Sequence, residues 1–271
     1  MQIKNYAILE YNRFKSILST LKEANFDVIT VNYTPEEKIY IRQSEKNFSF
    51  AISLDLPRDF FIRYSIQEKG HITFSIKTLL KSKQLLKQSE ITRNATATLI
   101  FDSKNSFSVI VKGKNTKARQ ITIPASQENF TMDVNRIKGL DKRRIYVDIS
   151  FKDWDFFVNN VVKYFYQQDR FNDLEILSTK ALDRTIFKIT YLNTGISFWQ
   201  SGLTKWYADS TTERVIATSY PLADIIRATF KSFDRDRTVV QMIYDKDSIL
   251  TIEYKCRQLR LKYYIGFIFE N

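Results

Sequence analysis

The sequence predicts an α+β chain made of two similar halves, each with two helices laid on an antiparallel sheet. The first observation is an internal repeat: residues 99–111 (LIFDSKNSFSVIV) align without a gap on residues 242–254 (MIYDKDSILTIEY). Each run reads as a strand, a polar turn opened by Asp102 or Asp245, and a second strand. The second observation is that helix and strand patterns precede both runs in the same order. A repeat of this kind indicates two copies of one structural unit.

The helices follow from apolar residues at helical spacing. The first helix of the first half, residues 11–23, has Phe14, Ile17, Leu18 and Leu21 on one face. Its counterpart in the second half, residues 153–166, has Phe157, Val158, Val161 and Phe165. A second helix is expected in each half, at residues 75–87 and 222–233.

The strands follow from runs rich in Ile, Val, Phe, Tyr and Thr, which suit a half-buried pleated surface. These runs are 27–31, 38–42 and 48–54 in the first half, and 174–179, 185–191 and 196–200 in the second. Residues 124–144 between the halves are polar and aperiodic, with one Pro and one Gly. The expected organisation is therefore a domain at 1–123, a connector at 124–144 and a second domain at 145–271.

The charge of the chain favours a polyanionic partner. Forty-two Lys and Arg against 30 Asp and Glu give a formal charge of +12, which suits nucleic acid first and an anionic membrane second. A basic, solvated surface without such a partner is the alternative. Cys256 is the only cysteine, so no intrachain disulfide is expected and a reducing compartment is the simpler interpretation. No signal-peptide core or membrane-length apolar run occurs, so we expect an intracellular, soluble protein with no membrane contact.

No constellation of catalytic residues is present. The sequence contains no phosphate-binding glycine loop, no metal-spaced Cys or His set and no nucleophile elbow. His71 is the only histidine and follows Gly70 at a predicted turn. Asp153 and Asp155 stand at a predicted helix start, where capping explains them, and Cys256 lies in a predicted strand. We therefore expect no catalytic residue, no metal and no cofactor, and a protein that is not an enzyme.

The C-terminal residues resemble a known family. Ile252-Glu253-Tyr254-Lys255, followed by Leu261-Lys262-Tyr263-Tyr264, is similar to the closing "VEYK…LKYY" signature of the proliferating cell nuclear antigen (PCNA) family, with the same spacing. Residues 14–28 resemble the family's opening helix and following strand, and residues 139–151 resemble the end of its interdomain connector. The resemblance implies a DNA sliding clamp: a homotrimeric ring around double-stranded DNA that tethers DNA polymerase and other replication and repair proteins, placed on DNA by a clamp loader.

The resemblance also implies three sets of site residues. The DNA-facing cations would be Arg13, Lys15, Lys22, Lys81, Lys83, Lys163, Arg227 and Lys231. The pocket for partner peptides would comprise Phe48, Phe50, Leu140, Phe233, Tyr264 and Gly266, with membership of an ordinary core as the alternative for Phe50. The subunit interface would pair two edge strands through Ala118, Gln120, Ile121, Ile196, Phe198 and Gln200.

Some residues depart from the family's pattern. The family is usually acidic, whereas this chain is basic; Gln43 stands at a usually apolar pocket position, and Gly266-Phe267 replaces Ala-Pro. These departures indicate a divergent lineage, with a virus among the candidate sources. The location would be the nucleus for a eukaryotic source and otherwise the cytoplasm, including viral replication sites.

Two other functions remain open at this point. One is a clamp-fold checkpoint subunit or transcription cofactor, which would assemble with different partners. The other is a basic protein that binds single-stranded nucleic acid and uses its many Phe and Tyr side chains as stacking platforms.

Overall fold

The contacts within the chain divide it into two units. The computed structural model describes residues 5–45, 47–83, 94–102, 105–113, 117–134, 137, 145–168, 173–179, 184–191, 194–200, 203–206, 215–246, 248–257 and 259–266. Unit 1 comprises residues 1–43, 53–132 and 230–233, and unit 2 comprises residues 44–52, 133–229 and 234–271. Each unit therefore receives a short segment from the other half of the sequence.

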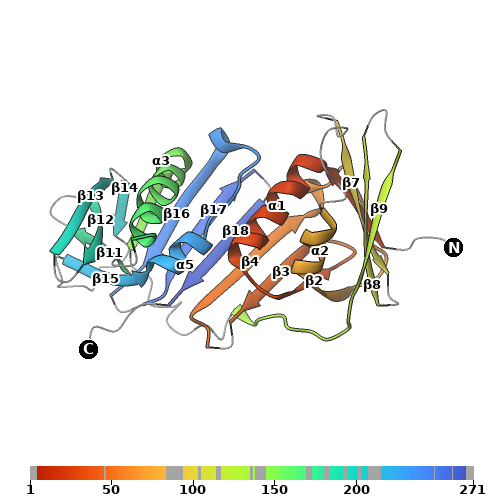
Figure 1. The fold of residues 1–271 in the computed structure, drawn as a ribbon, viewed down its shortest axis with the longest axis horizontal. Helices are drawn as coiled ribbons and strands as arrows, with labels where there is room; N and C mark the ends of the chain where they lie inside the picture. Colours follow the sequence, from red (N-terminus) through yellow and green to blue (C-terminus); the bar gives the residue numbers. More distant parts are fainter. Residues whose placement is uncertain are drawn as a thin grey trace. The chain divides into compact units, whose positions relative to one another are not determined.

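In its described residues, unit 1 contains two antiparallel sheets and two α-helices. Its elements are β1 (Tyr6–Glu10), α1 (Tyr11–Ala24), β2 (Val28–Tyr33), β3 (Lys38–Ser44), β4 (Phe50–Pro57), η1 (Arg58–Phe60), β5 (Arg63–Ser65), β6 (Gly70–Ser75), α2 (Ile76–Lys83), β7 (Thr96–Asp102), β8 (Ser106–Lys112) and β9 (Arg119–Pro124). One sheet has the order β5-β1-β7-β8-β9, and the other runs β4-β3-β2-β6. The two helices lie side by side over one face of β2, β3 and β4 (Figure 1).

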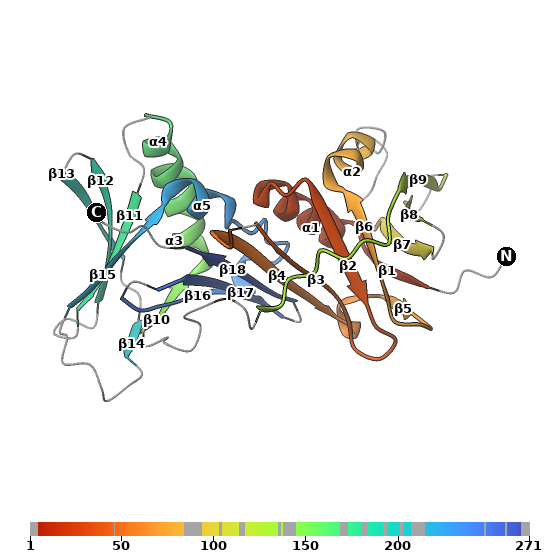
Figure 2. The ribbon, with the colours of Figure 1, turned by 90° about the horizontal axis from the view of Figure 1, so that it is seen from below.

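Unit 2 is built in the same way. Its elements are β10 (Ile145–Ser150), α3 (Phe151–Phe156), the π-helical turn η5 (Phe157–Val162), α4 (Lys163–Tyr166), β11 (Asp173–Thr179), β12 (Arg184–Tyr191), β13 (Thr194–Gln200), β14 (Leu203–Trp206), β15 (Val215–Pro221), α5 (Leu222–Arg227), η6 (Arg235–Arg237), β16 (Thr238–Tyr244), β17 (Leu250–Cys256) and β18 (Leu259–Ile265). The sheets run β14-β10-β16-β17-β18 and β13-β12-β11-β15. The continuous helix α3–η5–α4 and helix α5 lie over the face of β16, β17 and β18 (Figure 2).

The strand orders of the two units correspond one to one. The order β5-β1-β7-β8-β9 matches β14-β10-β16-β17-β18, and β4-β3-β2-β6 matches β13-β12-β11-β15. Helix α1 follows the first strand of its unit, as α3 does, and α2 follows β6 as α5 follows β15. The predicted fold class, two similar halves with helices on antiparallel sheets, is therefore confirmed.

Helix α1 forms where the apolar spacing predicts it. Phe14, Ile17, Leu18 and Leu21 are all buried. The helix ends at Asn25, which adopts the left-handed conformation (φ 57°) and donates its backbone N–H to the Lys22 carbonyl at 3.1 Å. Asparagine tolerates this conformation better than most residues, so it stops the helix as a glycine would.

The repeated hairpins are β7–β8 and β16–β17, as predicted. In the second turn, the Asp245 backbone N–H donates to Ser248 Oγ at 2.7 Å, and the Lys246 N–H donates to Asp245 Oδ1 at 2.8 Å. The carboxylate therefore stabilises the turn by bonding nearby backbone, as its sequence position indicated. The side chain of Asp102 lies outside the described part of the structure.

Helix α5 ends at Arg227, six residues before the end predicted at residue 233. The cause is tertiary hydrogen bonding to the backbone that would have continued the helix. Tyr254 Oη donates to the Ala228 carbonyl at 2.8 Å and accepts from Trp154 Nε1 at 2.7 Å. Tyr263 Oη donates to the Thr229 carbonyl at 2.9 Å. These buried bonds override the local helical pattern, and burial raises the pKa of the Tyr254 hydroxyl far above its usual range.

Helix α2 ends at Lys83 in the described structure. Residues 84–87 of the predicted helix lie outside the described residues. None of the helices that the structure describes is both long and apolar enough to cross a membrane.

Candidate functional site

The helices of unit 1 present a stripe of lysines. On α1 the side chains at helical spacing that are not buried are Asn12, Lys15, Ser19 and Lys22, and Lys22 is exposed. On the neighbouring helix α2, Lys77 and Lys81 are exposed one turn apart. Lys15, Lys22 and Lys81 have no ion pair with any described residue, whereas Lys77 contacts Asp27. Residues three, four and seven apart share a helix face, so Lys15 and Lys22 share one face of α1 and Lys77 and Lys81 share one face of its neighbour α2.

Arg13 is not part of this free basic surface, although the sequence placed it among the DNA-facing cations. Its guanidinium donates to the Phe60 carbonyl at 2.8 Å and lies 3.4 Å from the Glu10 carboxylate. It also covers the rings of Phe60 and Phe233, at 5.2 and 5.5 Å. Arg13 therefore ties α1 to η1 within unit 1, and this geometry does not fit the expected role.

A π-helical turn changes the register of the long helix in unit 2. The sequence predicts a buried face at Phe157, Val158, Val161 and Phe165, but Val162 is the fully buried valine and Val161 is only half-buried. The wider turn of η5 rotates the later residues by about one position. Lys163, expected to face DNA, is half-buried and donates to Asn159 Oδ1 at 2.8 Å.

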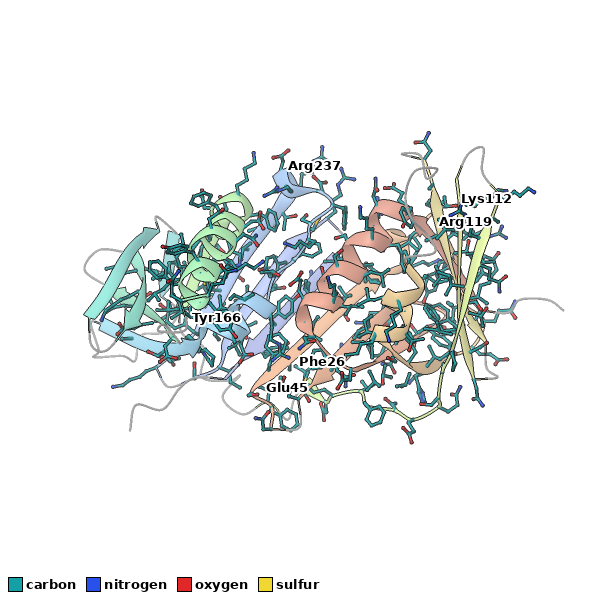
Figure 3. The ribbon with its side chains drawn as sticks, in the orientation of Figure 1. Phe26, Glu45, Lys112, Arg119, Tyr166 and Arg237 are labelled. Atoms are coloured by element: carbon teal, nitrogen blue, oxygen red, sulfur yellow. The ribbon has the colours of Figure 1, made fainter. Side chains whose placement is uncertain are left out.

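The exposed face of this helix is aromatic and amide-rich. Asp153, Phe156, Asn160 and Tyr164 are exposed at successive turns. The side chains of Phe156 and Tyr164 are 63% and 57% exposed. Neither ring therefore belongs to the core. Tyr166 at the end of α4 is also exposed (Figure 3). The apolar-periodicity pattern does not reveal this face, because it identifies only the buried positions.

Arg227 also lies in a different setting from the one expected. Its guanidinium contacts the Glu45 carboxylate at 2.7 Å and the Asp224 carboxylate at 3.0 Å. It covers the Phe50 ring at 4.1 Å, all within unit 2. Burial raises the pKa of the Asp224 carboxyl above its usual value, while the Arg227 charge opposes the shift. Arg227 is therefore a structural partner of two carboxylates rather than a free cation.

The remaining DNA-facing candidates are two lysines. Lys231 lies beyond the end of α5 and not on a helix as predicted. Its backbone carbonyl accepts from Ser16 Oγ and its N–H donates to Thr20 Oγ1 at 3.4 Å, so this part of the chain is held against α1 within unit 1. Lys83 ends α2, and its side chain is outside the described part of the structure.

The pocket candidates in unit 2 lie on opposite faces of the strands. On β18, Leu261 and Tyr263 are fully buried on the face that packs beneath the helices, and Lys262 and Tyr264 alternate with them on the other face. Phe50 is fully buried and its ring lies 5.8 Å from that of Tyr263. Alternation along a strand therefore places Phe50 in the core and Tyr264 on the outer face. Phe50 does not share a pocket surface with Tyr264.

The loop before β4 is held close to the end of β18. The Gly266 N–H donates to the Ser49 carbonyl at 2.7 Å, and Ser49 Oγ donates to the Glu45 carboxylate at 2.7 Å. Phe48 in this loop is 41% exposed and has a positive φ of 58°. A Cβ at Gly266 would lie only 3.3 Å from the Ser49 carbonyl oxygen, so this close approach favours glycine. Of the other pocket candidates, Leu140 lies outside the described residues and Phe233 belongs to unit 1.

Two outer-face residues beside Tyr264 do not stand out in the sequence. Thr251 pairs with Tyr264 on one side and with Ile243 on the other, so the three form a row across β16, β17 and β18. All three are buried. The hydroxyl of Thr251 has no hydrogen-bond partner in the described structure. The alternating strand pattern places these residues on one face, but register is needed to bring them together.

A second row beside them is polar. Asp148, Gln241, Glu253 and Lys262 are consecutive cross-strand neighbours on β10, β16, β17 and β18. Gln241 Nε2 donates to Asp148 Oδ1 at 2.7 Å, and the buried Glu253 carboxylate lies 3.6 and 3.7 Å from Lys255 and Lys262. This row separates the apolar one from solvent-exposed Lys255 and Arg260.

The two strands expected to form the subunit interface are both sheet edges. Strand β9 ends one sheet of unit 1 and β13 ends one sheet of unit 2, and neither has a described strand on its outer side. On β9 and just before it, Ala118, Arg119 and Gln120 are exposed (Arg119 in Figure 3), whereas Ile121 is buried. Ile196, Phe198 and Gln200 lie on β13, and their side chains are outside the described part of the structure.

No metal centre is found in the part of the chain that the structure describes. No group of three or more His, Cys, Asp or Glu residues there has the arrangement needed to hold an ion. Cys256 is buried, and His71 Nε2 contacts the Gln127 carbonyl at 2.8 Å.

We predict that Arg227→Met will lower the free energy of unfolding by about 1–3 kcal/mol at pH 7, because Asp224 and Glu45 lose their shared counter-ion. Without Arg227, the folded-state pKa of Asp224 should rise further above its unfolded value. The penalty is then present above that pKa and shrinks as pH falls through it. Denaturant unfolding at pH 7 and pH 4 measures both effects. Lys22→Met is the control and should change stability by less than about 0.5 kcal/mol; equal effects of the two variants would refute the structural role of Arg227.

The comparisons with known proteins agree on the fold. No protein-family model matches the sequence, and no curated protein matches it. Among solved structures, PCNA from Thermococcus kodakaraensis superposes with a TM-score of 0.74 at 19% identity, covering 97% of this chain and 99% of that one. The PCNA2–PCNA3 complex from Sulfolobus tokodaii gives 0.74 at 13% identity, covering 97% and 98%. A. fulgidus PCNA, bound to the C-terminal region of FEN-1, gives 0.71 at 9% identity, covering 98% and 99%. From end to end, the chain therefore has the fold of a PCNA-type DNA clamp.

Proposed function

We propose that the chain is a DNA sliding clamp, a non-enzymatic ring that encircles duplex DNA and tethers replication proteins. The observation that supports this most strongly is the duplicated topology together with end-to-end similarity to PCNA structures. Basic helices in unit 1 and a formal charge of +12 suit a phosphate backbone that is gripped without reading bases. In this proposal the domains are residues 1–123 and 145–271, joined by the connector at 124–144.

The correspondence between the strands of the two units indicates how copies of the chain would pair. In unit 2, β18 is followed in its sheet by the first residues of β4, Phe50–Ile52, which belong to the same unit. Strand β9 is the counterpart of β18, and β13 is the counterpart of β4. The same pairing repeated between copies would join β9 of one subunit to β13 of the next, covering both open edges. Such a head-to-tail contact is heterologous and forms a ring when its rotation closes; the resemblance implies three subunits.

The partner site in this proposal is the outer-face row of Ile243, Thr251 and Tyr264, together with Phe48, Gly266 and Leu140. The FEN-1 segment bound to A. fulgidus PCNA is an example of a partner for a protein of this fold. A DNA polymerase, other clamp-binding proteins and a clamp loader are the partners we expect for this chain.

The assembly proposal predicts a homotrimer that depends on the edge of β9. In β9, the N–H groups of Gln120 and Thr122 point away from β8, because the Ala125 N–H bonds Asn105 and alternate residues face alternate directions. Gln120→Pro removes one outward donor and should convert the trimer to monomers in sedimentation velocity, with unfolding little changed. Gln120→Ala keeps the N–H and should remain trimeric. A stable wild-type monomer at micromolar concentration would contradict the ring.

The partner proposal predicts a role for Tyr264. Tyr264→Ala should weaken binding of a peptide from the C-terminal region of FEN-1 by about 1–3 kcal/mol in calorimetry, because the buried ring packs the row that would support the peptide and its loss leaves a cavity there. Phe156→Ala removes an exposed aromatic ring elsewhere in unit 2 and should leave the affinity unchanged. If folded Tyr264→Ala binds the peptide as the wild type does, the site is misplaced.

A further inference from the structure

We propose that the phosphates of the encircled DNA are contacted by the helices of unit 1 and not by those of unit 2. This inference rests on the clamp function proposed above, in which the helices face the DNA. It assigns the contact to a surface defined by Lys15, Lys22, Lys77 and Lys81, here called the α1–α2 surface.

The composition of the helices differs sharply between the units. Helices α1 and α2 hold cations at six positions and a single acid, Glu23. The cations are Arg13, Lys15, Lys22, Lys77, Lys81 and Lys83. In unit 2, the α3–η5–α4 helix and α5 together hold three cations and three acids. These are Lys152, Lys163 and Arg227 against Asp153, Asp155 and Asp224. Only the unit 1 helices therefore have the excess positive charge that attracts a phosphate backbone.

The cations on the α1–α2 surface are also free to move to a phosphate. Lys15 and Lys22 stand two turns apart on the same face of α1, with only the small polar Ser19 between them. Lys81 is exposed on the adjacent helix. Lys77 has a partner, Asp27, but the two side chains are 66% and 78% exposed, so solvent screens this pair and it contributes little. A phosphate can therefore approach without breaking a buried interaction.

Two of the three cations on the unit 2 helices are held within the unit. Lys163 is half-buried and donates to Asn159. Lys152 lies 2.9 Å from Asp236, but the two side chains are 71% and 78% exposed, so solvent screens this pair as it does Lys77–Asp27. Arg227 is shared between Glu45 and Asp224 and covers Phe50. Releasing Arg227 would leave partly buried carboxylates without a counter-ion, which costs more than an exposed phosphate contact returns.

The exposed residues of the α3–η5–α4 helix include one cation, Lys152, beside one acid, Asp153. Phe156, Asn160 and Tyr164 follow at successive turns. The Asp153 carboxylate offsets the Lys152 charge, and the two rings and the amide are neutral. The phosphates would then be drawn toward the unit 1 helices, which hold the excess positive charge.

The test compares two double variants of the full-length assembly that change the net charge equally. The first variant, Lys22→Glu with Lys81→Glu, reverses two charges on the unit 1 helices. The second, Lys152→Glu with Lys163→Glu, reverses two charges on the unit 2 helices. Affinity for a short DNA duplex is measured by fluorescence anisotropy over a series of salt concentrations. The unit 1 pair should lower the affinity at least about tenfold at low salt, and its log–log salt slope should be shallower by about two. The unit 2 pair should change the affinity by less than about twofold and keep the wild-type slope.

Sedimentation and unfolding of each variant verify that the assembly is intact. If the unit 1 charge reversal disrupts assembly, Lys22→Gln with Lys81→Gln is used and should give a smaller loss in the same direction. Equal losses from the two pairs, or no loss from the unit 1 pair, would overturn the assignment and leave the clamp function standing. A wild-type assembly that binds no duplex at any salt concentration would instead refute the clamp function itself.

Discussion

Two buried tyrosine hydroxyls determine where helix α5 of the second unit ends. Tyr254 and Tyr263 donate to the carbonyls of Ala228 and Thr229, and these bonds end α5 at Arg227. The short helix leaves Arg227 beside Glu45, Asp224 and Phe50, where it stabilises the loop before β4. It also leaves Lys231 outside any helix. The end of α5 thus follows from hydrogen bonds in the core, since buried polar groups must be satisfied.

The second constraint is the open strand edge. Each unit builds the same two sheets, and the duplicated order makes β9 the counterpart of β18 and β13 the counterpart of β4. Within unit 2, the start of β4 already lies next to β18, held by the bond from Gly266 to Ser49. An unpaired edge invites another strand. Because β4 already covers the edge of β18 within the chain, the same pairing can cover the equivalent edges, β9 and β13, between two copies.

The sequence predicts the architecture better than the sites. The repeated hairpins, the apolar face of α1 and the two-unit organisation all depend on local periodicity, which a single sequence contains. The end of α5 depends on Tyr254 and Tyr263, which are distant in sequence, so periodicity alone extends the helix too far. The π turn at η5 shifts burial from Val161 to Val162, which a regular helical period does not predict. For Arg13, Arg227 and Phe50, the sequence identifies a charge or a ring, but only tertiary structure shows what it contacts.

The proposed clamp encloses DNA topologically rather than binding its surface. The most direct measurement needs no loader. Linear duplex is incubated with excess protein so that rings can thread over its ends. Half of the sample is then circularised with ligase, and both halves are washed at high salt, which removes purely electrostatic contacts. We expect the protein to remain on the closed circles and to be lost from the linear DNA. Equal retention on the two forms would contradict encirclement.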